Sequence, residues 1–362
     1  MAATEGCGLM DGVLRVLVVD DSAYVRKVVR EMLSRSPFIE VVGVARDGRE
    51  GLELTKQLNP DVVTCDLIMP ELDGVGFVRE QMLRRPLPII IMSIADENAE
   101  AVLNALDSGA VDFLQKPTAL ASERILEISS ELIDKVKAAG NISVERIQRD
   151  TANGRLAAPA GKPASTEVVV GSHSVDIVVL GISTGGPQAL KSLIPKLPGD
   201  FPVPVALVMH MPVGYTEMYA RRLDELSPLN VREATEGDAV RPGVVLIAAA
   251  GKHMTFRRRP DRTVVTHLDT RPLDTLHRPS VDVMFQSAAE TFRDRVLAVV
   301  MTGMGSDGKQ GAAWIKSQGG LVYTESEETC VVYGMPASVV EAGLSDKSVP
   351  LGRLAQVIRE VV

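Results

Sequence analysis

Short apolar runs alternate with stretches of helical periodicity over the first 138 residues. Val16–Val19 is a continuous apolar run of the length expected for a buried strand. The segment Ser22–Leu33 that follows repeats its apolar residues every three or four positions, as one face of a helix does. The predicted strands are Val16–Val19, Val41–Val44, Val62–Cys65, Ile89–Met92 and Val111–Leu114, and the predicted helices are Ser22–Leu33, Gly48–Leu58, Glu97–Asp107 and Leu120–Ala138. Five short strands alternating with helices predict a parallel sheet that is covered on both faces.

The periodicity is lost between about residues 139 and 170 and resumes at Val175. Ala157–Ser165 reads AAPAGKPAS, a composition typical of a flexible linker, although Ile142–Ile147 keeps enough pattern for a helix. Further on, the predicted strands are Ile177–Leu180, Val205–Met209, Val244–Ala248 and Val296–Met301, and helices are predicted after Pro187 and over 284–292, Gly311–Gln318 and Pro336–Ala342. We therefore expect an α/β fold with two doubly wound parallel-sheet domains, residues 13–138 and 171–362, joined by a flexible linker over residues 139–170.

The composition is that of an ordinary globular protein and argues against several other classes. Of the 362 residues, 45% are apolar and 24% are charged. No apolar run approaches the roughly 18–20 residues of a membrane-spanning helix, so insertion into a membrane is not expected. No basic residue precedes Arg15, which argues against a secretory signal. Cys7, Cys65 and Cys330 are odd in number and far apart, which favours reduced thiols and a cytoplasmic protein.

Charge is unevenly distributed between the two parts of the chain. Residues 1–138 carry 15 Lys and Arg against 23 Asp and Glu, a net charge of −8, whereas the remainder carries 24 of each. With no basic stripe interleaved with aromatic residues, binding to nucleic acid is not expected. All five histidines lie beyond residue 170, so any imidazole chemistry belongs to the second part.

Polar residues follow several strands of the first predicted sheet at their carboxyl ends. Asp20 and Asp21 follow the first strand, Asp66 the third and Ser93 the fourth, while Lys116 comes just after the fifth. The carboxyl ends of parallel strands meet at one edge of a sheet, where these carboxylates would repel one another unless a hard cation such as Mg²⁺ lay between them. Any one aspartate could simply form a turn, but the set as a whole predicts a metal and phosphate site.

The segments VVDDS, CDLIMPELDG, MS and KP, in this order, resemble those of response-regulator receiver domains, which have a flavodoxin-like fold. Residues 13–138 carry the resemblance, with Ser at position 93 where Thr is common. The resemblance implies phosphorylation in the presence of Mg²⁺ by a histidine kinase as phosphodonor. It implies that Asp66 is the phospho-acceptor and that Asp20, Asp21, Asp66 and the Ile68 carbonyl form the metal site. It further implies that Ser93 and Phe113 are switch residues and that Lys116 pairs with the phosphate.

A serine motif opens the second part of the chain. GISTG at 181–185 has the G-x-S-x-G pattern of a nucleophile elbow, placed after a strand and before a helix. A phosphate-binding glycine loop or a plain strand–helix turn would look similar. His210 follows the next strand and Asp307 follows a later one, so Ser183, His210 and Asp307 could meet at one sheet edge. Their order fits none of the three common triad orders, but a triad is defined by geometry.

Five segments, GISTGG, HMPVG, HRPSVD, TGMGSDG and YGMPA, are similar to those of the protein-glutamate methylesterases of chemotaxis. With the receiver, this resemblance covers nearly the whole chain, although Ile182 and Ser306 depart from the usual residues. It implies a Rossmann-like domain that hydrolyses glutamate methyl esters of methyl-accepting chemoreceptors, deamidates glutamines and needs no cofactor for the ester reaction. It implies that Ser183 is the nucleophile, His210 the base and Asp307 the acid that orients His210. The oxyanion donors would be the backbone N–H groups of Thr184 and Met304, and His277 would lie beside the active site.

Other functions remain open at this point. The chain could be a phosphorylation-switched binding module whose GISTGG loop holds a phosphate, or a hydrolase of small esters. A DNA-binding response regulator is disfavoured because the second half is neutral and lacks a helix-turn-helix pattern. The two-domain order also suggests that the unphosphorylated receiver covers the Ser183 site. The receptor, the kinase and the oligomeric state are not specified by the sequence.

Overall fold

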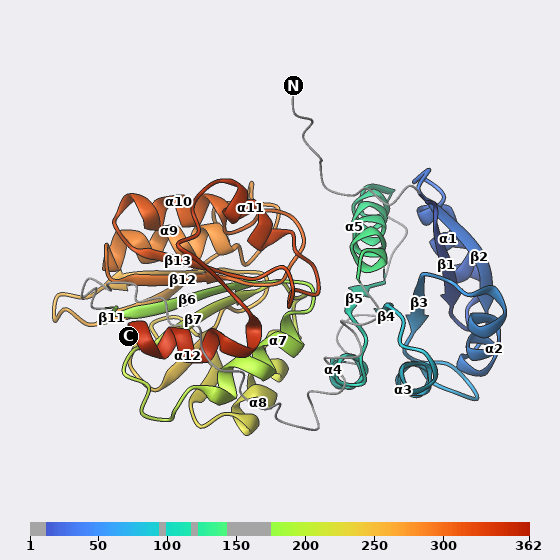
Figure 1. Cartoon of the computed structure of the whole chain (residues 1–362), viewed down its shortest axis with the longest axis horizontal. Helices are drawn as coiled ribbons and strands as arrows, with labels where there is room; N and C mark the ends of the chain where they lie inside the picture. The colour runs from blue at the N-terminus through green and yellow to red at the C-terminus, as the bar shows by residue number, and fades with distance from the viewer. Residues whose placement is uncertain (1–11, 94–98, 117–121, 143–174) are drawn as a thin grey trace. The chain divides into compact units, whose positions relative to one another are not determined.

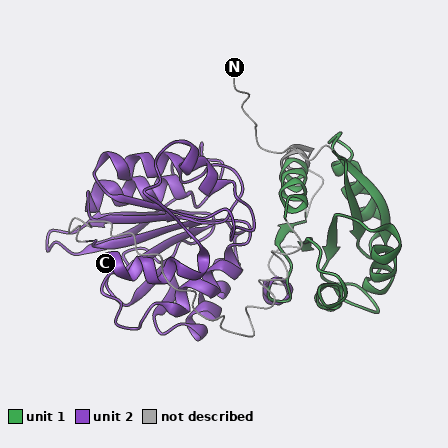
Figure 2. Cartoon of the chain, in the orientation of Figure 1, with its two compact units in different colours: residues 1–94, 107–149 green, residues 95–106, 150–362 purple. Residues whose placement is uncertain are grey.

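The computed structural model describes residues 12–93, 99–116, 122–142 and 175–362. The chain divides into two compact units, residues 1–94 with 107–149, and residues 95–106 with 150–362 (Figure 2). The predicted linker over 139–170 and the predicted helix at Ile142–Ile147 lie almost entirely outside the described residues. The domain limits 13–138 and 171–362 therefore remain predictions.

The first unit contains a five-stranded parallel sheet with the order β2-β1-β3-β4-β5. The strand order reverses between β1 and β3, which places a ligand crevice outside their carboxyl ends, as in other flavodoxin-like sheets. Figure 1 shows these elements in blue and green. The elements are β1 (Leu14–Val19), α1 (Ala23–Leu33), β2 (Ile39–Ala45), α2 (Gly48–Leu58), β3 (Val62–Asp66), α3 (Gly74–Arg84), β4 (Ile89–Ser93), β5 (Asp112–Gln115) and α5 (Ser122–Gly140).

The second unit is built on a seven-stranded parallel sheet with the order β14-β13-β12-β6-β7-β9-β8. Helices α9, α10 and α11 cover one face, and α7, α8 and α12 cover the other (Figure 1). An antiparallel pair, β10 and β11, is added beside the sheet. The strands are β6 (Ile177–Ile182), β7 (Val205–Met209), β8 (Asn230–Glu233), β9 (Val244–Ile247), β10 (His253–Arg258), β11 (Val264–Asp269), β12 (Val296–Val300), β13 (Leu321–Glu325) and β14 (Lys347–Val349). The helices are α4 (Ala99–Asp107), which is grouped with this unit, α7 (Gly186–Leu193), α8 (Thr216–Leu226), α9 (Val281–Phe292), α10 (Lys309–Ser317), α11 (Met335–Glu341) and α12 (Leu351–Val361).

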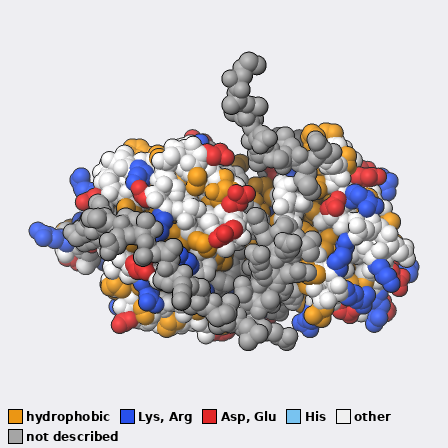
Figure 3. Space-filling model, viewed as in Figure 1, with side chains coloured by type: hydrophobic (Ala, Val, Ile, Leu, Met, Phe, Trp, Pro, Cys, Tyr) orange, Lys and Arg blue, Asp and Glu red, His pale blue; other side chains and the backbone are white. Residues whose placement is uncertain are grey.

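Burial explains why the central strands are continuous apolar runs rather than alternating ones. Every residue of β6, β7 and β12 is buried, because helices lie on both faces of the sheet. On the face that α9 covers, Val179, Val208 and Phe285 belong to one continuous apolar core. Over the described surface in Figure 3, basic and acidic side chains are intermixed with apolar ones. None of the described helices combines the length and apolar character needed to cross a membrane.

The α/β fold class with parallel sheets is confirmed, and several elements were absent from the predicted pattern. Helix α3 was missed because Gly74 and Gly76 weaken its helical signal. Gly74 is required where it is, since a Cβ there would lie 2.2 Å from the Asp66 carbonyl oxygen. The short strands β8, β13 and β14, the antiparallel pair β10 and β11, and helices α8 and α12 were also not predicted.

Candidate functional site

The central strand β6 brings the serine and histidine segments together. Strands β6 and β7 are neighbours in register, with Ile182 opposite Met209, and the His210 N–H donates to the Ile182 carbonyl at 3.2 Å. On the other side, the Ser183 N–H donates to the Thr302 carbonyl, 3.0 Å away in the loop that follows β12. The three segments therefore meet at the carboxyl edge of the sheet, beside the point where the strand order reverses.

Ser183 lies in a tight turn between β6 and α7. The Gly186 N–H donates to the Ser183 carbonyl at 2.7 Å, and Gly185 adopts φ +80°, a conformation that favours glycine. Thr302 stabilises this turn from the side, because its Oγ1 donates to the Thr184 carbonyl at 2.8 Å. The Thr302 N–H donates to the fully buried carboxylate of Glu325 at 3.0 Å. The turn is thus fixed by buried hydrogen bonds and leaves Ser183 partly exposed.

Gly303 lies directly against the serine. A Cβ at this position would lie 2.8 Å from the Ser183 Cβ and 3.1 Å from its backbone nitrogen. We expect Gly303→Ala to displace Ser183 and lower kcat about 10²-fold for a reaction in which Ser183 is the nucleophile, the loss typical of a misplaced reacting group. Steady-state kinetics would measure it, with Gly352→Ala as control, since a Cβ there meets nothing within 4 Å. Wild-type kcat in a folded Gly303→Ala variant would contradict the expectation.

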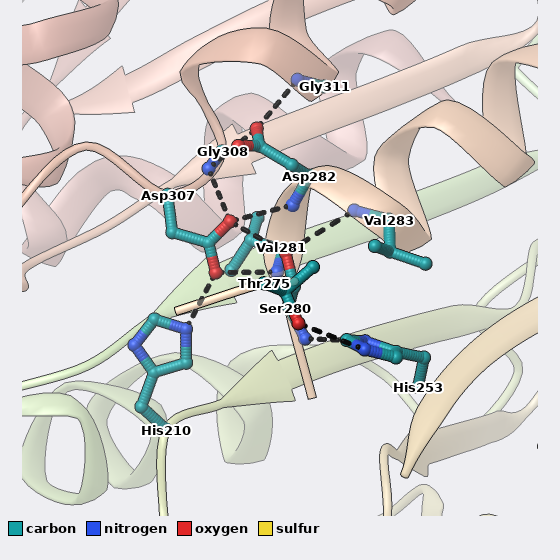
Figure 4. Close-up of polar contacts among 10 residues, drawn as sticks. All are labelled: His210, His253, Thr275, Ser280, Val281, Asp282, Val283, Asp307, Gly308 and Gly311. Atoms are coloured by element: carbon teal, nitrogen blue, oxygen red, sulfur yellow. Dashed lines mark hydrogen bonds and ion pairs between the residues drawn. The ribbon is translucent and has the colours of Figure 1, made fainter. Parts of the chain in front are cut away.

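His210 and Asp307 form a direct pair. The His210 Nε2 lies 2.8 Å from the Asp307 Oδ2, and both side chains are largely buried (Figure 4). The His210 ring also stacks on the His277 ring, with centroids 4.0 Å apart. Because the Nε2–H group donates to the Asp307 carboxylate, Nδ1 is the unprotonated nitrogen of this tautomer. The buried Nδ1 has no hydrogen-bond partner among the described residues.

Asp307 is held by the N-terminus of helix α9. Its carboxylate accepts hydrogen bonds from the Ser280 hydroxyl at 2.9 Å, the Val281 N–H at 2.8 Å and the Asp282 N–H at 2.9 Å (Figure 4). Burial opposes ionisation, but the hydrogen bond and charge of His210, with these backbone donors, hold the Asp307 pKa well below its usual range. Asp307 is therefore a carboxylate throughout the physiological range.

Asp282, beside it, behaves in the opposite way. Burial, together with the charge of Asp307, raises the pKa of Asp282 to about 6 despite hydrogen bonds from Gly308 and Gly311. The folded chain therefore binds this proton more tightly than the unfolded chain does. Stability contributed by this protonation rises as the pH falls toward 5 and is lost as the pH rises through about 6.

When the pH falls from about 7 to about 5, we expect the free energy of unfolding of the wild type to rise by roughly 1 kcal/mol relative to that of Asp282→Asn, because solvent screens part of the interaction. Asp307, whose pKa is lowered, makes the stability depend on pH only at more acidic pH. Thermal unfolding at the two pH values, followed by the fluorescence of the single tryptophan, Trp314 in α10, would measure the difference. A stability difference that does not change with pH would contradict the raised pKa.

His253 is a buried residue whose two ring nitrogens both form hydrogen bonds within the protein. It is fully buried, its Nδ1 accepts from the Ser280 N–H at 3.2 Å, and its Nε2 lies 3.1 Å from the Pro272 carbonyl. Burial lowers the pKa of His253, so the ring is neutral and donates through Nε2. It orders the segment that carries Ser280 and His277. The HRPSVD motif pointed to this segment, but nothing in the sequence identified His253 as its anchor.

The acidic residues of the first unit converge as predicted from the strand ends. Oxygen atoms of Asp20, Asp21 and Asp66 lie within 4.8 Å of one another. The buried Lys116 Nζ lies 2.6 Å from Asp20 and 2.8 Å from Asp66. Burial raises the pKa of Asp66, while Lys116 opposes the rise. A set of clustered carboxylate oxygens fits a hard cation such as Mg²⁺, which would relieve their repulsion.

The remaining predicted receiver residues are Ser93, Phe113 and Ile68. Ser93 is buried at the end of β4, and its carbonyl accepts from the Lys116 N–H at 2.6 Å. Phe113 is buried in β5, whereas the side chain of Ile68, two residues after Asp66, is 61% exposed. The roles of Ile68, Ser93 and Phe113, like those of Thr184, Met304 and His277 in the second unit, stay predictions.

Comparisons with known proteins cover nearly the whole chain. The CheB methylesterase family matches residues 178–358, and the response regulator receiver domain family matches residues 16–128. Protein-glutamate methylesterase/protein-glutamine glutaminase 5 of Myxococcus xanthus is 48% identical over 96% of this chain and 98% of its own length. The chain belongs to the CheB methylesterase family. A relative in Symbiobacterium thermophilum, named protein-glutamate methylesterase/protein-glutamine glutaminase, is 45% identical over 96% of this chain and 97% of its own length.

The family's fold is also seen in a solved structure. The CheB methylesterase catalytic domain of Thermotoga maritima is 43% identical, with a TM-score of 0.51, and it covers 52% of this chain and 100% of its own. The CheB family resemblance drawn from the sequence motifs is thus confirmed, as is the receiver domain that precedes the catalytic domain.

Proposed function

We propose that this chain hydrolyses the methyl esters of glutamate side chains on chemoreceptors, releasing methanol, and that phosphorylation of its receiver domain activates it. By the same chemistry it converts glutamine side chains to glutamate with release of ammonia. The observation that carries the proposal is the His210–Asp307 pair at 2.8 Å, in which the buried His210 Nδ1 has no hydrogen-bond partner among the described residues and His210 directly follows β7, the neighbour of the strand that leads into Ser183. We place this activity in the cytoplasm, in chemotactic adaptation.

Ser183 supplies the nucleophile in this mechanism. Its Oγ forms a bond to the ester carbonyl carbon while His210 Nδ1 takes the hydroxyl proton, and the carbonyl electrons move onto oxygen. Collapse of this intermediate breaks the bond to methoxide, which receives the proton from His210 and leaves as methanol. Water then attacks the acyl-enzyme by the same steps, which restores Ser183 and releases glutamate. A positioned general base contributes typically about 10²–10⁴-fold.

Asp307 keeps His210 in the reactive tautomer. Its carboxylate accepts a hydrogen bond from the Nε2–H group and stabilises the imidazolium that forms when Nδ1 is protonated. The stacked His277 ring limits rotation of His210. We assign the oxyanion donors to the backbone N–H groups of Thr184 and Met304, each worth on the order of 10²–10³-fold.

The receiver domain supplies the switch. A carboxylate oxygen of Asp66 forms the bond to the phosphorus of a phosphodonor, and the bond from phosphorus to the donor breaks. Lys116 pairs with the resulting phosphoryl oxygens. Mg²⁺ held by Asp20, Asp21, Asp66 and the Ile68 carbonyl would neutralise the charge of the transferring group. A histidine kinase is the proposed physiological donor.

The test is methanol release from a methylated chemoreceptor cytoplasmic fragment by the full chain, with and without a phosphodonor and Mg²⁺. We expect methanol release that rises with the phosphodonor, and kcat/KM at least about 10²-fold above that for a small methyl ester such as methyl acetate, because remote contacts contribute to transition-state binding. Equal or faster turnover of the small ester, with no methanol from the receptor fragment, would support a hydrolase of small esters instead.

A further inference from the structure

Asp307 and Asp282, two aspartates near His210, accept hydrogen bonds from each other's segments. Asp307, which precedes α10, accepts from the first two N–H groups of α9, those of Val281 and Asp282. Asp282, which lies in α9, accepts from the Gly308 N–H at 2.9 Å and the Gly311 N–H at 2.7 Å, at the start of α10. Figure 4 shows this crossed arrangement, in which each carboxylate satisfies backbone donors of the other segment.

This arrangement is more than ordinary helix capping. Ser280 caps α9 through its hydroxyl, which accepts from the Val283 N–H at 3.5 Å, and Asp307 supplies the acceptors for the Val281 and Asp282 N–H groups. Two carboxylates placed together repel each other, and an asparagine at position 282 would accept the same donors without that repulsion. Helix N-termini on both sides compensate part of the charge. The crossed pair therefore has a consequence beyond stability, which is the fixed position of the Asp307 carboxylate.

Asp307 itself lies in a loop that needs external support. It is flanked by the exposed Ser306 and by Gly308, which has φ +97°. Asp282 holds the far side of this loop through Gly308 and Gly311, so the side chain of Asp307 is fixed from both directions. The hydrogen bond to His210 Nε2 depends on that position.

We propose that Asp282 is a positioning residue for the triad: its hydrogen bonds to Gly308 and Gly311 hold Asp307 where it can orient His210. The inference rests on the proposed function and adds a residue to its machinery. Asp282 touches neither the substrate nor the reacting atoms. Its contribution comes from where its acceptor oxygen lies, and not from its charge.

Three substitutions in the full chain separate position from charge. Asp282→Asn keeps an acceptor oxygen in the same place without charge, whereas Asp282→Glu keeps the charge but moves the acceptor by one methylene. Asp282→Ala removes both. Asp224→Ala is the matched control, since Asp224 also accepts a backbone N–H, that of Val231 at 2.7 Å, but at the edge strand β8.

We expect kcat for methanol release to fall about 10²-fold in Asp282→Ala and Asp282→Glu, with KM within about threefold of wild type, because a displaced triad member impairs the chemical step. Asp282→Asn should retain kcat within about threefold of wild type, since its oxygen still accepts both N–H groups. The downfield ¹H NMR resonance of the His210 Nε2 proton should persist in Asp282→Asn and shift or vanish in Asp282→Glu. Asp224→Ala should lower the unfolding temperature without changing kcat.

Each outcome decides between positioning and a purely structural or electrostatic role. Folded Ala and Glu variants with wild-type kcat would overturn the inference, and so would an active Glu variant beside an inactive Asn variant. If Asp282→Ala does not fold, as judged by Trp314 fluorescence, the comparison of Asn with Glu decides alone. If the wild type itself releases no methanol, the proposed function fails, and the NMR comparison still tests whether Asp282 positions the pair.

Discussion

Ser183→Ala is expected to lower methanol release by roughly 10⁴- to 10⁶-fold, the loss seen when a triad nucleophile is removed. The alanine side chain cannot form the acyl-enzyme, so His210 Nδ1 has no hydroxyl proton to take. The fold should not change, because Ser183 contributes its backbone to the turn through the Thr302 carbonyl and the Gly186 N–H, and alanine keeps both. Methanol release under single-turnover conditions, compared with the wild type, measures the effect.

Ser306→Ala provides the matched control for this prediction. It removes the same hydroxyl group from an exposed residue next to Asp307, and we expect kcat within about twofold of wild type. Ser183→Ala with more than a tenth of wild-type kcat would exclude a serine nucleophile. It would mean that another group supplies the nucleophile, whereas a wild type that also releases no methanol would favour the alternative in which the GISTGG loop binds a phosphate.

The meeting of the candidate residues could be predicted because it follows from topology alone. Parallel strands end at one edge, so a serine after β6 and a histidine after β7 could be expected to meet there, and the neighbouring positions of β6 and β7 in the sheet bring them together. The same argument brought Asp20, Asp21 and Asp66 together. It needed only the apolar runs and the residues that follow them.

Other features depend on contacts that no local pattern encodes. Which imidazole nitrogen faces Asp307 is set by the loop that follows β12 and by the stacked His277, which is distant in the chain. Strand β13 was missed because it ends in a polar residue, Glu325. This side chain is fully buried, and the Thr302 N–H and the Thr329 hydroxyl donate to it. Asp282 was part of the recognised HRPSVD segment, but its crossed pairing with Asp307 could be found only in three dimensions.

The second large prediction concerns the receiver: we expect Asp66→Asn to abolish phosphorylation completely. An asparagine amide is not nucleophilic at its oxygen toward phosphorus as a carboxylate is, so no acyl phosphate forms. Lys116 still pairs with Asp20, at 2.6 Å, so the buried lysine stays compensated and the domain should remain folded. Incorporation of phosphoryl groups from acetyl phosphate with Mg²⁺ would be measured, together with methanol release.

The control is Asp73→Asn, the same substitution at the start of α3, close to the acidic cluster. Asp73 caps this helix by accepting from the Gly76 N–H at 2.7 Å, and asparagine caps as well as aspartate does. We expect Asp73→Asn to be phosphorylated and activated like the wild type, whereas Asp66→Asn keeps its basal methanol release and gains nothing from the phosphodonor. Phosphoryl incorporation into Asp66→Asn would place the acceptor at another residue. Activation without incorporation would mean that the phosphodonor acts on the esterase other than through the receiver. Loss of activation in Asp66→Asn alone would link the acidic cluster of the first unit to the chemistry of Ser183 in the second.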